Sequence, residues 1–247
     1  MLTTILAAAP AAATDNPYGL QQALQEGGLI AQTVFAILVL MSVGTFYILF
    51  TKMFEQQKVM GQGKRVRSTF WNSNSLNEAA AKLEKNSAYK QIVDDGLAAQ
   101  GQHSKLTDPV EAHDWLHNSL ARSEAAINTK LGSGLAFLAT VGSVSPFIGL
   151  FGTVVGIYRA LIKIGASGQA SIDAVAGPVG EALIMTALGL VVAVPAVLAF
   201  NWLQSRNKSI AAELSAFSTD VLGYLASSGA VRPATRGAAS KAPAKAG

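Results

Sequence analysis

The stretch GPVGEALIMTALGLVVAVPAVLAFNWL, residues 177–203, decides the fold of this chain. It holds no charged residue from position 182 to position 205, and Glu181 is the carboxylate near its start. A helix needs about 20 apolar residues to cross the hydrocarbon core of a bilayer, so this stretch is long enough to span a membrane. An ionised carboxylate at that depth is stable only beside protein or water, so we expect Glu181 to face the inside of a helix assembly.

Small residues recur along this stretch at intervals of four and three positions. In a helix, that spacing places them on one face, where the lack of bulk lets a second membrane helix approach closely. The sequence therefore predicts a packing seam on the third span, with Glu181 at its mouth. The members of this seam are Ala182, Thr186, Gly189, Ala193 and Ala196.

The composition of the whole chain is typical of an integral membrane protein. Of its 247 residues, 50% are hydrophobic and only 14% are charged, and no alternating strand pattern occurs, so we predict an all-α membrane fold. The absence of cysteine excludes disulfides and thiol chemistry. The net charge of +4 does not indicate nucleic-acid binding, because several basic residues lie in the final tail, where they favour solubility or attraction to anionic lipid. These residues are Arg232, Arg236, Lys241 and Lys245.

We expect three transmembrane helices, at residues 29–50, 131–162 and 174–203, with a short periplasmic link at 163–173. Positive charge near the span ends marks the cytoplasmic side of a membrane protein. The N-terminal segment 1–28 is therefore predicted to be periplasmic, the C-terminus cytoplasmic, and the protein to lie in a bacterial inner membrane. The cytoplasmic basic residues are Lys52, Lys58, Lys64, Arg65, Arg67, Arg122, Lys130, Arg206 and Lys208, against Arg159 and Lys163 beside the link.

The polar region 51–130 is predicted to form long cytoplasmic helices rather than a separate globular domain. Ser75 and Glu78 form a capping box, which opens a helix expected to close near Gly96. A second helix start lies at 108–111, with a proline in its first turn, and the helix is expected to run without interruption toward the second span.

The two ends of the chain differ in character. The segment 1–28 has a short apolar core broken by Pro10 and no basic start, which favours an uncleaved leader with an amphipathic part near the membrane over a signal peptide. The third span is expected to continue as a cytoplasmic helix at 204–229. The alanine-rich basic segment 230–247 is expected to be disordered.

A second seam of small residues lies in the second span, again with intervals of four and three. Packing alone explains its glycines, but it explains less well why both seams contain a threonine. Each of these two spans also contains a proline, Pro146 in the second and Pro195 in the third. A proline leaves one backbone carbonyl of its helix without a hydrogen-bond donor, which protein or water must then supply. The second-span seam consists of Gly142, Pro146, Gly149, Thr153, Gly156 and Ala160.

Enzymatic function is not indicated. The chain has no phosphate-binding GxxxxGK[ST] loop, no nucleophile with recognisable partners and no basic aromatic surface for nucleic acid. His113 and His117 are four residues apart, but no acidic residue completes a metal motif, so we expect no metal, no cofactor and solvated histidines. Trp115 between them is expected to pack against a neighbouring helix.

Two motifs carry a family resemblance: ATVGSVSPFIGLFGTVVGI at 139–157 and AGPVGEALIMTALGLVVAVPAVLAFN at 176–201. In this order and at this separation they resemble the ExbB/TolQ/MotA family of inner-membrane proton-channel subunits. The link between them is most similar to the ExbB branch, while the TolQ branch shares much of the core motif. The flagellar-stator branch has four spans, so the three spans predicted here argue against that branch. Val155 stands where relatives often have tryptophan. This difference alters packing but involves none of the proposed ionisable groups.

The resemblance implies a ring of identical subunits, five in the family's best-described form, in contact with membrane lipids. The second and third spans would line a pore that holds the single membrane helices of ExbD, whose aspartate carries the proton. Thr153 and Thr186 match pore-lining threonines, and Glu181 matches a glutamate that either belongs to the proton route or is structural. The motion would energise TonB, which opens outer-membrane transporters for siderophore-bound iron and vitamin B12. Helix packing is implied for Pro146, Gly149, Gly152, Gly156, Gly189 and Pro195.

Two alternatives remain open from the sequence. A TolQ-like subunit would couple the same proton gradient to outer-membrane integrity in the Tol-Pal system. A non-conducting scaffold would use its seams only to assemble helices, and its function would not depend on the proton gradient.

Overall fold

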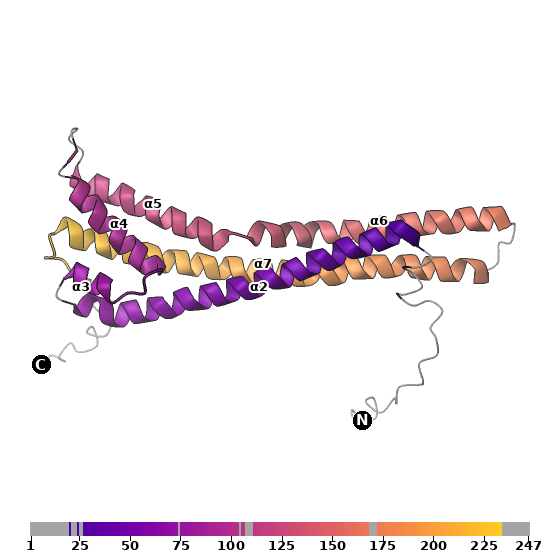
Figure 1. Cartoon of the computed structure of the whole chain (residues 1–247), viewed down its shortest axis with the longest axis horizontal. Coiled ribbons are helices and arrows are strands. Elements are labelled where there is room, and N and C mark those ends of the chain that lie inside the picture. The colour runs from indigo at the N-terminus through magenta and orange to yellow at the C-terminus, as the bar shows by residue number, and fades with distance from the viewer. Residues whose placement is uncertain are drawn as a thin grey trace, which may run out of the picture. The chain divides into compact units, whose positions relative to one another are not determined.

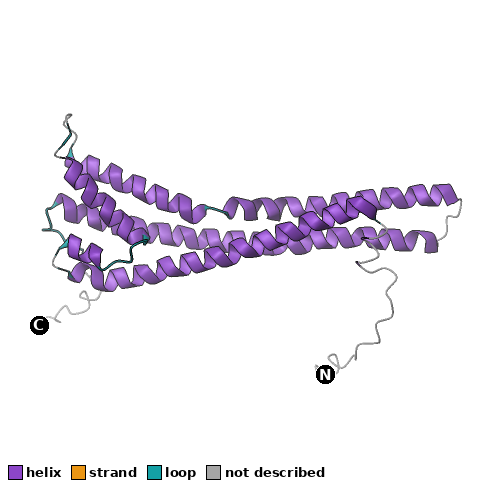
Figure 2. Cartoon of the chain, in the orientation of Figure 1, coloured by secondary structure: helices purple, strands orange, loops and turns teal. Residues whose placement is uncertain are grey.

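A computed structural model describes most of the chain, and every regular element in the described part is helical (Figure 1). The predicted all-α membrane fold is confirmed: Figure 2 shows no strand in the described residues, and three helices are long and apolar enough to cross a membrane. The described residues are 20, 24, 27–73, 75–103, 105–106, 111–167 and 172–233, without the side chains of Lys163, Ser167, residues 172–178 and Glu181. Most of the leader, part of the link and residues 234–247 of the tail therefore lie outside the described residues.

The chain divides into two compact units. We call residues 1–47 and 137–200 the membrane unit, and residues 48–136 and 201–247 the extension unit. The helices are α2 (Gly28–Thr69), the short η1 (Phe70–Asn72), α3 (Leu76–Ala81), α4 (Ala88–His103), α5 (Ala112–Gly132), α6 (Leu135–Ser167) and α7 (Ile172–Ala226).

The membrane unit is built from parts of α2, α6 and α7. Its buried cluster is small and contains one methionine among aliphatic side chains: Val34, Leu38, Val141, Met185, Val192 and Ala196. Many large apolar side chains of the same helices remain exposed, among them Phe147 at 70% and Leu40 at 71%. Exposed apolar surface of this kind is stable in lipid or against another protein, but not in water.

The helix that leads into the second span is interrupted, which corrects the prediction of one continuous helix. α5 ends at Gly132 and α6 begins at Leu135, so the helix does not run through, while the predicted bounds of the span, 131–162, stay a prediction. Ser133 is extended and Gly134 has a φ of +85°, a left-handed conformation that glycine adopts without strain. Lys52 Nζ stabilises the end of α5 by donating to the carbonyl oxygen of Lys130 at 2.9 Å.

The predicted capping box at the start of α3 is confirmed, because Ser75 Oγ accepts a hydrogen bond from the Glu78 N–H at 3.2 Å. The predicted end near Gly96 is wrong. The first helix closes at Ala81, and α4 begins at Ala88 under a second cap, in which Ser87 Oγ accepts from the Lys90 N–H at 3.1 Å. Gly96 lies inside α4, where a Cβ would come within 3.0 Å of a leucine of α7.

The extension unit has a conventional core, to which η1, all the helices from α3 to α5 and the ends of α2 and α7 contribute. Its fully buried side chains include Ile92 and Val93 of α4 and Val221 of α7. Trp115 packs against α4 as predicted, with its indole N–H donating to the Ala99 carbonyl at 2.8 Å. The third span continues past Leu203 without a break, since α7 is one helix to Ala226.

α5 begins at Ala112, with Glu111 as its N-cap residue. Most of the predicted helix start at 108–111 lies outside the described residues. His113 and His117 stack with ring centroids 6.4 Å apart, and no group of three or more possible metal ligands occurs in the part of the chain that the structure describes.

Candidate functional site

The two small-residue seams meet each other in the membrane unit, on facing sides of α6 and α7. A Cβ placed on Gly149 would lie 2.6 Å from the Met185 carbonyl oxygen and 3.1 Å from Gly189 Cα. A Cβ on Gly189 would lie 2.6 Å from the Ser145 carbonyl oxygen. Real Cβ atoms are not found this close to backbone, so only glycine at both positions permits this approach.

The contact continues in both directions from this crossing point. On one side, a Cβ on Gly156 would lie 3.0 Å from the Ala182 Cβ, and one on Gly152 would lie 3.0 Å from the Met185 Cβ. On the other side, a Cβ on Gly142 would lie 2.5 Å from a methyl group of Val197. The nearest atoms here belong to side chains, but a Cβ atom or a methyl group of valine can move little, so bulk is restricted at these glycines as well.

Thr153 and Thr186 face each other across this helix contact. Thr153 is 4% exposed, and its hydroxyl donates to the Leu150 carbonyl one turn back at 2.7 Å. The Thr186 hydroxyl donates to Thr153 Oγ1 at 3.4 Å, a long and therefore weak hydrogen bond. Thr186 itself is only half-buried, so it is the accessible end of a two-hydroxyl chain that ends on Leu150.

A third hydroxyl lies at the same contact and was not predicted as a site residue from the sequence. Ser145 is fully buried, with 0% exposure, and its hydroxyl donates to the Val141 carbonyl at 2.6 Å. Its own carbonyl is the atom that lies against Gly189. The available signal was its position next to Pro146 and four residues before Gly149, on the seam face.

The other predicted site residues belong to the same two helices. Pro146 lies inside α6 and Pro195 inside α7, both half-buried, and neither ends its helix. Each lacks the N–H that would satisfy the carbonyl four residues earlier. Glu181 lies in α7, one residue before Ala182 of the seam, and its side chain is outside the described part of the structure.

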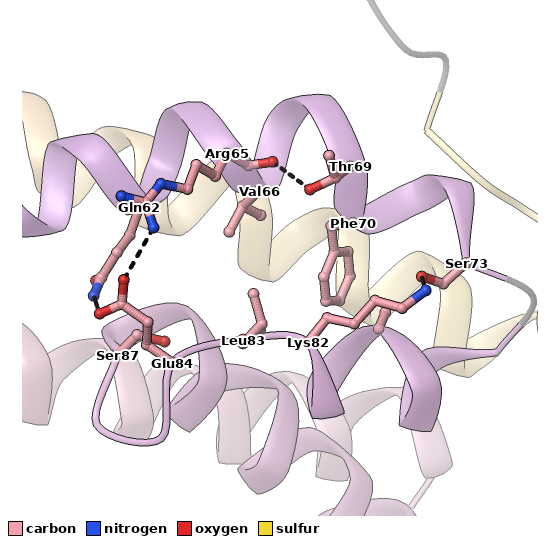
Figure 3. A pocket seen from close by; sticks show the side chains of 11 residues that line it. Gln62, Arg65, Val66, Thr69, Phe70, Ser73, Lys82, Leu83, Glu84 and Ser87 are labelled. Carbon is pink, nitrogen blue, oxygen red and sulfur yellow. Dashed lines mark hydrogen bonds and ion pairs between the residues drawn. The ribbon is translucent and has the colours of Figure 1, made fainter.

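A pocket with charged side chains lies in the extension unit, between α2 and the turn after α3 (Figure 3). Glu84 accepts a hydrogen bond from Gln62 Nε2 at 2.7 Å and pairs with Arg65 at 3.3 Å and Lys58 at 3.6 Å. The Gln62 hydrogen bond and the two cations lower the pKa of Glu84 below its usual value. The volume of the pocket is about 130 Å³, and its floor is apolar, with Val66 and other side chains. This arrangement stabilises the turn and positions no hydroxyl of the seams.

Both seams lie within the part of the chain that matches a known protein family. Residues 84–216 match the MotA/TolQ/ExbB proton channel family, and this match includes all seam residues of α6 and α7. The chain belongs to this family. The biopolymer transport protein ExbB of Xanthomonas campestris pv. campestris (strain B100) is 38% identical over 213 residues, which cover 82% of this chain and 84% of that protein.

Two further relatives carry the names of two branches of the family, ExbB and TolQ. The biopolymer transport protein ExbB of Neisseria meningitidis serogroup A is 36% identical over 208 residues, covering 82% of this chain and 94% of that protein. The Tol-Pal system protein TolQ of Haemophilus influenzae is 30% identical over 198 residues, covering 75% of this chain and 84% of that protein. These relatives cover 75–82% of this chain, and they support its membership in the proton channel family.

Proposed function

We propose that this chain is an inner-membrane subunit of a proton-driven motor of the ExbB type, without enzymatic activity. In this proposal its N-terminus is periplasmic and its C-terminus cytoplasmic, and it works with a single-span ExbD-like partner to energise TonB-dependent outer-membrane transport of siderophore iron and vitamin B12. The observation that carries the proposal is the hydroxyl pair of Thr153 and Thr186 on a glycine-only helix contact, inside the region that matches the proton channel family.

The hydroxyl pair can respond to the protonation state of a partner's carboxyl group. Thr153 already donates to Leu150, so only its acceptor function is available, and Thr186 fills it through a weak bond. If an ionised carboxylate lay beside Thr186, the Thr186 hydroxyl would donate its hydrogen bond to that carboxylate instead of to Thr153, because a charged acceptor makes the stronger hydrogen bond. A protonated carboxylic acid would instead donate to Thr186 Oγ1 and let Thr186 return to Thr153. Proton uptake would thus change how the partner helix is held.

The exposed apolar surface of the membrane unit fits assembly with further copies and with partner helices. On α6, Phe147 is 70% exposed and Tyr158 64%, and on α7 Val191 is 66% exposed. Surfaces on both helices remain uncovered by the single chain, so lipid or other subunits must cover them. In a ring of identical subunits, five by family resemblance, each chain contacts a neighbour on either side, which accounts for more than one such surface per chain.

A TolQ-like role is the second candidate, because the Haemophilus influenzae relative named TolQ is 30% identical over 75% of this chain. The seams and the threonine pair would work in the same way, but the energy would support outer-membrane integrity. A scaffold that only assembles helices is the alternative from a different class. It explains the glycines, but it gives no reason for a hydroxyl pair at the contact.

Complementation separates these three functions. A strain that lacks this gene would receive the wild-type gene on a plasmid, and ferric-siderophore uptake and resistance to detergent would be measured with and without a protonophore. Restored uptake that the protonophore abolishes is expected for the ExbB-type motor. Restored detergent resistance without an effect on uptake would assign the chain to the Tol system. Function that is insensitive to the protonophore would indicate the scaffold.

The role of Glu181 is tested in the same strain. We expect Glu181→Ala to abolish uptake while the protein still accumulates in the membrane, and Glu181→Gln distinguishes the two roles. Loss of uptake with Gln would place the carboxylate in the proton route, because Gln keeps the size and hydrogen-bonding capacity but not the charge. Normal uptake with Gln would assign Glu181 a structural role.

A further inference from the structure

The extension unit contains a second, larger cavity whose function the motor does not explain. Its volume is about 580 Å³, and it lies between the end of α2, the start of α4 and the outer part of α7. Aromatic side chains form part of its wall, and charged side chains reach into it. The aromatic residues are Trp71, Tyr89 and Phe217, and the charged residues are Arg67, Glu213 and Asp220.

The charges in this cavity are not balanced. Arg67 pairs with Glu213 at 3.4 Å, which leaves one carboxylate more than the cavity has cations. Among the described residues, none forms a hydrogen bond or ion pair with the side chain of Asp220, and partial burial raises the pKa of its carboxyl group. Tyr89 remains a neutral hydrogen-bond donor, because burial and the nearby Glu213 raise its pKa to about 12. The cavity therefore lacks one cation beside Asp220.

The C-terminal end of the described chain turns back toward this cavity. After α7, the Gly229 N–H donates to the Tyr224 carbonyl at 2.8 Å, and Gly229 has a φ of +89°, which reverses the chain direction. Arg232 then lies over the Tyr224 ring at 5.9 Å and donates to the Ser73 carbonyl at 3.4 Å. Pro233, the last described residue, forms part of the cavity wall.

The residues that follow Pro233 supply the missing charge. The sequence 234–247 is ATRGAASKAPAKAG, with three basic residues and no acidic one. We propose that the cavity binds this segment of the same chain, with Arg236 as the side chain that enters and Asp220 as its ion-pair partner. Arg236 follows Pro233 by three residues, which span about 10 Å when extended, so it can reach a cavity that Pro233 already lines.

The chemistry of the cavity suits a guanidinium group in particular. A planar guanidinium stacks on aromatic rings and forms paired hydrogen bonds with a carboxylate, and Trp71 and Asp220 offer these two contacts in one cavity. The guanidinium of Arg232, just before this segment, already lies over the Tyr224 ring. Binding of 234–247 would therefore continue a contact that the structure contains.

Limited trypsin digestion of the purified full chain in detergent tests this proposal. Cleavage after Lys241 is followed by mass spectrometry and compared with cleavage of a synthetic peptide of residues 230–247. We expect cleavage in the wild-type chain to be about fivefold slower than in the peptide, the order of protection that one partly buried ion pair gives. Asp220→Asn and Arg236→Gln should each raise the rate toward that of the peptide, and the double variant should add nothing further.

Asp114→Asn, the same chemical change at an exposed position of α5, is the matched control and should keep the slow rate. Arg236→Gln changes only the bound segment, so a folding defect in Asp220→Asn cannot account for both results. Equal rates for the wild-type chain and the peptide, or additive effects of the two substitutions, would overturn the proposal. Protection that requires phosphatidylglycerol vesicles and is independent of Asp220 would also overturn it and assign the segment to anionic lipid.

Discussion

The membrane unit and the extension unit of this chain bury their side chains in different ways. In the membrane unit, α6 and α7 meet through glycines, alanines and hydroxyls, and only 17% of the most apolar part of the first span is buried. In the extension unit, large aliphatic and aromatic side chains such as Ile92, Leu214 and Phe217 form a continuous core. Capped helix ends and ion pairs complete the extension unit, as they do in water-soluble proteins.

This difference shows what each unit needs from its surroundings. The extension unit contains enough apolar side chains to stabilise itself, since burial of each large side chain contributes about 1.5–3 kcal/mol. The membrane unit gains little from burial in lipid, so its internal contact depends on close backbone approach, and its exposed faces depend on lipid and partners. A small change in volume should therefore have its greatest effect at the α6–α7 contact, where no flexible side chain can adjust.

Gly149→Leu should have the largest effect, because its Cβ would lie 2.6 Å from a backbone oxygen and the rest of the side chain has no space. We expect α6 and α7 to separate locally, with a loss of stability of about 3 kcal/mol or more and no uptake activity. Gly165→Leu is the matched control, because nothing lies within 4 Å of a Cβ there. Thermal unfolding in detergent measures both, and equal melting temperatures would contradict the glycine-only contact.

Ile92→Ala should rank next and act on the extension unit. Ile92 has 0% exposure, so its truncation leaves a cavity and lowers stability by about 2–5 kcal/mol. Leu40→Ala in the membrane unit removes a side chain that is 71% exposed and should change the melting temperature in detergent far less. Comparable shifts for both variants would mean that the two units do not differ in how they are stabilised.

Ser75→Ala should have a smaller effect, because it removes the single hydrogen bond to Glu78 N–H at the start of α3. Loss of an N-cap lowers stability by about 1 kcal/mol. Ser215→Ala at an exposed site of α7 is the control and should be neutral. Hydrogen exchange of α3 amides reports this change locally, and unchanged protection in Ser75→Ala would show that core packing alone determines where α3 begins.

Glu84→Gln should have the smallest effect, and that effect should depend on pH. Because the pKa of Glu84 is lowered in the folded protein, its contribution is present above about pH 4.3, the usual glutamate value. That contribution is lost as the pH falls through the lowered folded-state pKa. Gln should therefore reduce the melting temperature slightly at pH 7 and not at a pH below the lowered folded-state pKa, and high salt should diminish the difference. A difference that grows toward acid would contradict this assignment.

The spans and seams could be predicted from sequence because each depends on residues of one helix. An uncharged apolar run and the spacing of Gly149, Thr153, Thr186 and Gly189 contain that information locally. The helix break at 133–134 was missed although the sequence Gly-Ser-Gly at 132–134 was a signal for it. Long apolar and helical patterns on both sides outweighed it in the prediction.

The structure adds contacts that no local pattern contains. The second cap at Ser87 depends on where α3 ends, and that end is set by packing in the extension unit rather than by propensity. Likewise, sequence placed Thr153 and Thr186 each on a seam, but only the structure shows that the Thr186 hydroxyl donates to Thr153. The side chain of Glu181 lies outside the described residues, so its role stays a prediction.

Ferric-siderophore uptake by the double variant Thr153→Val and Thr186→Val tests the central claim most directly. Valine keeps the shape of threonine and removes both hydroxyls, so the helix contact should persist while the response to a partner's carboxyl group is lost. The control is Thr33→Val on α2, an exposed threonine that also donates to its own helix. We predict that the double variant reaches the membrane in normal amount but takes up no iron, while Thr33→Val takes it up normally. Normal uptake by the double variant would contradict a role for the hydroxyl pair in proton-driven work.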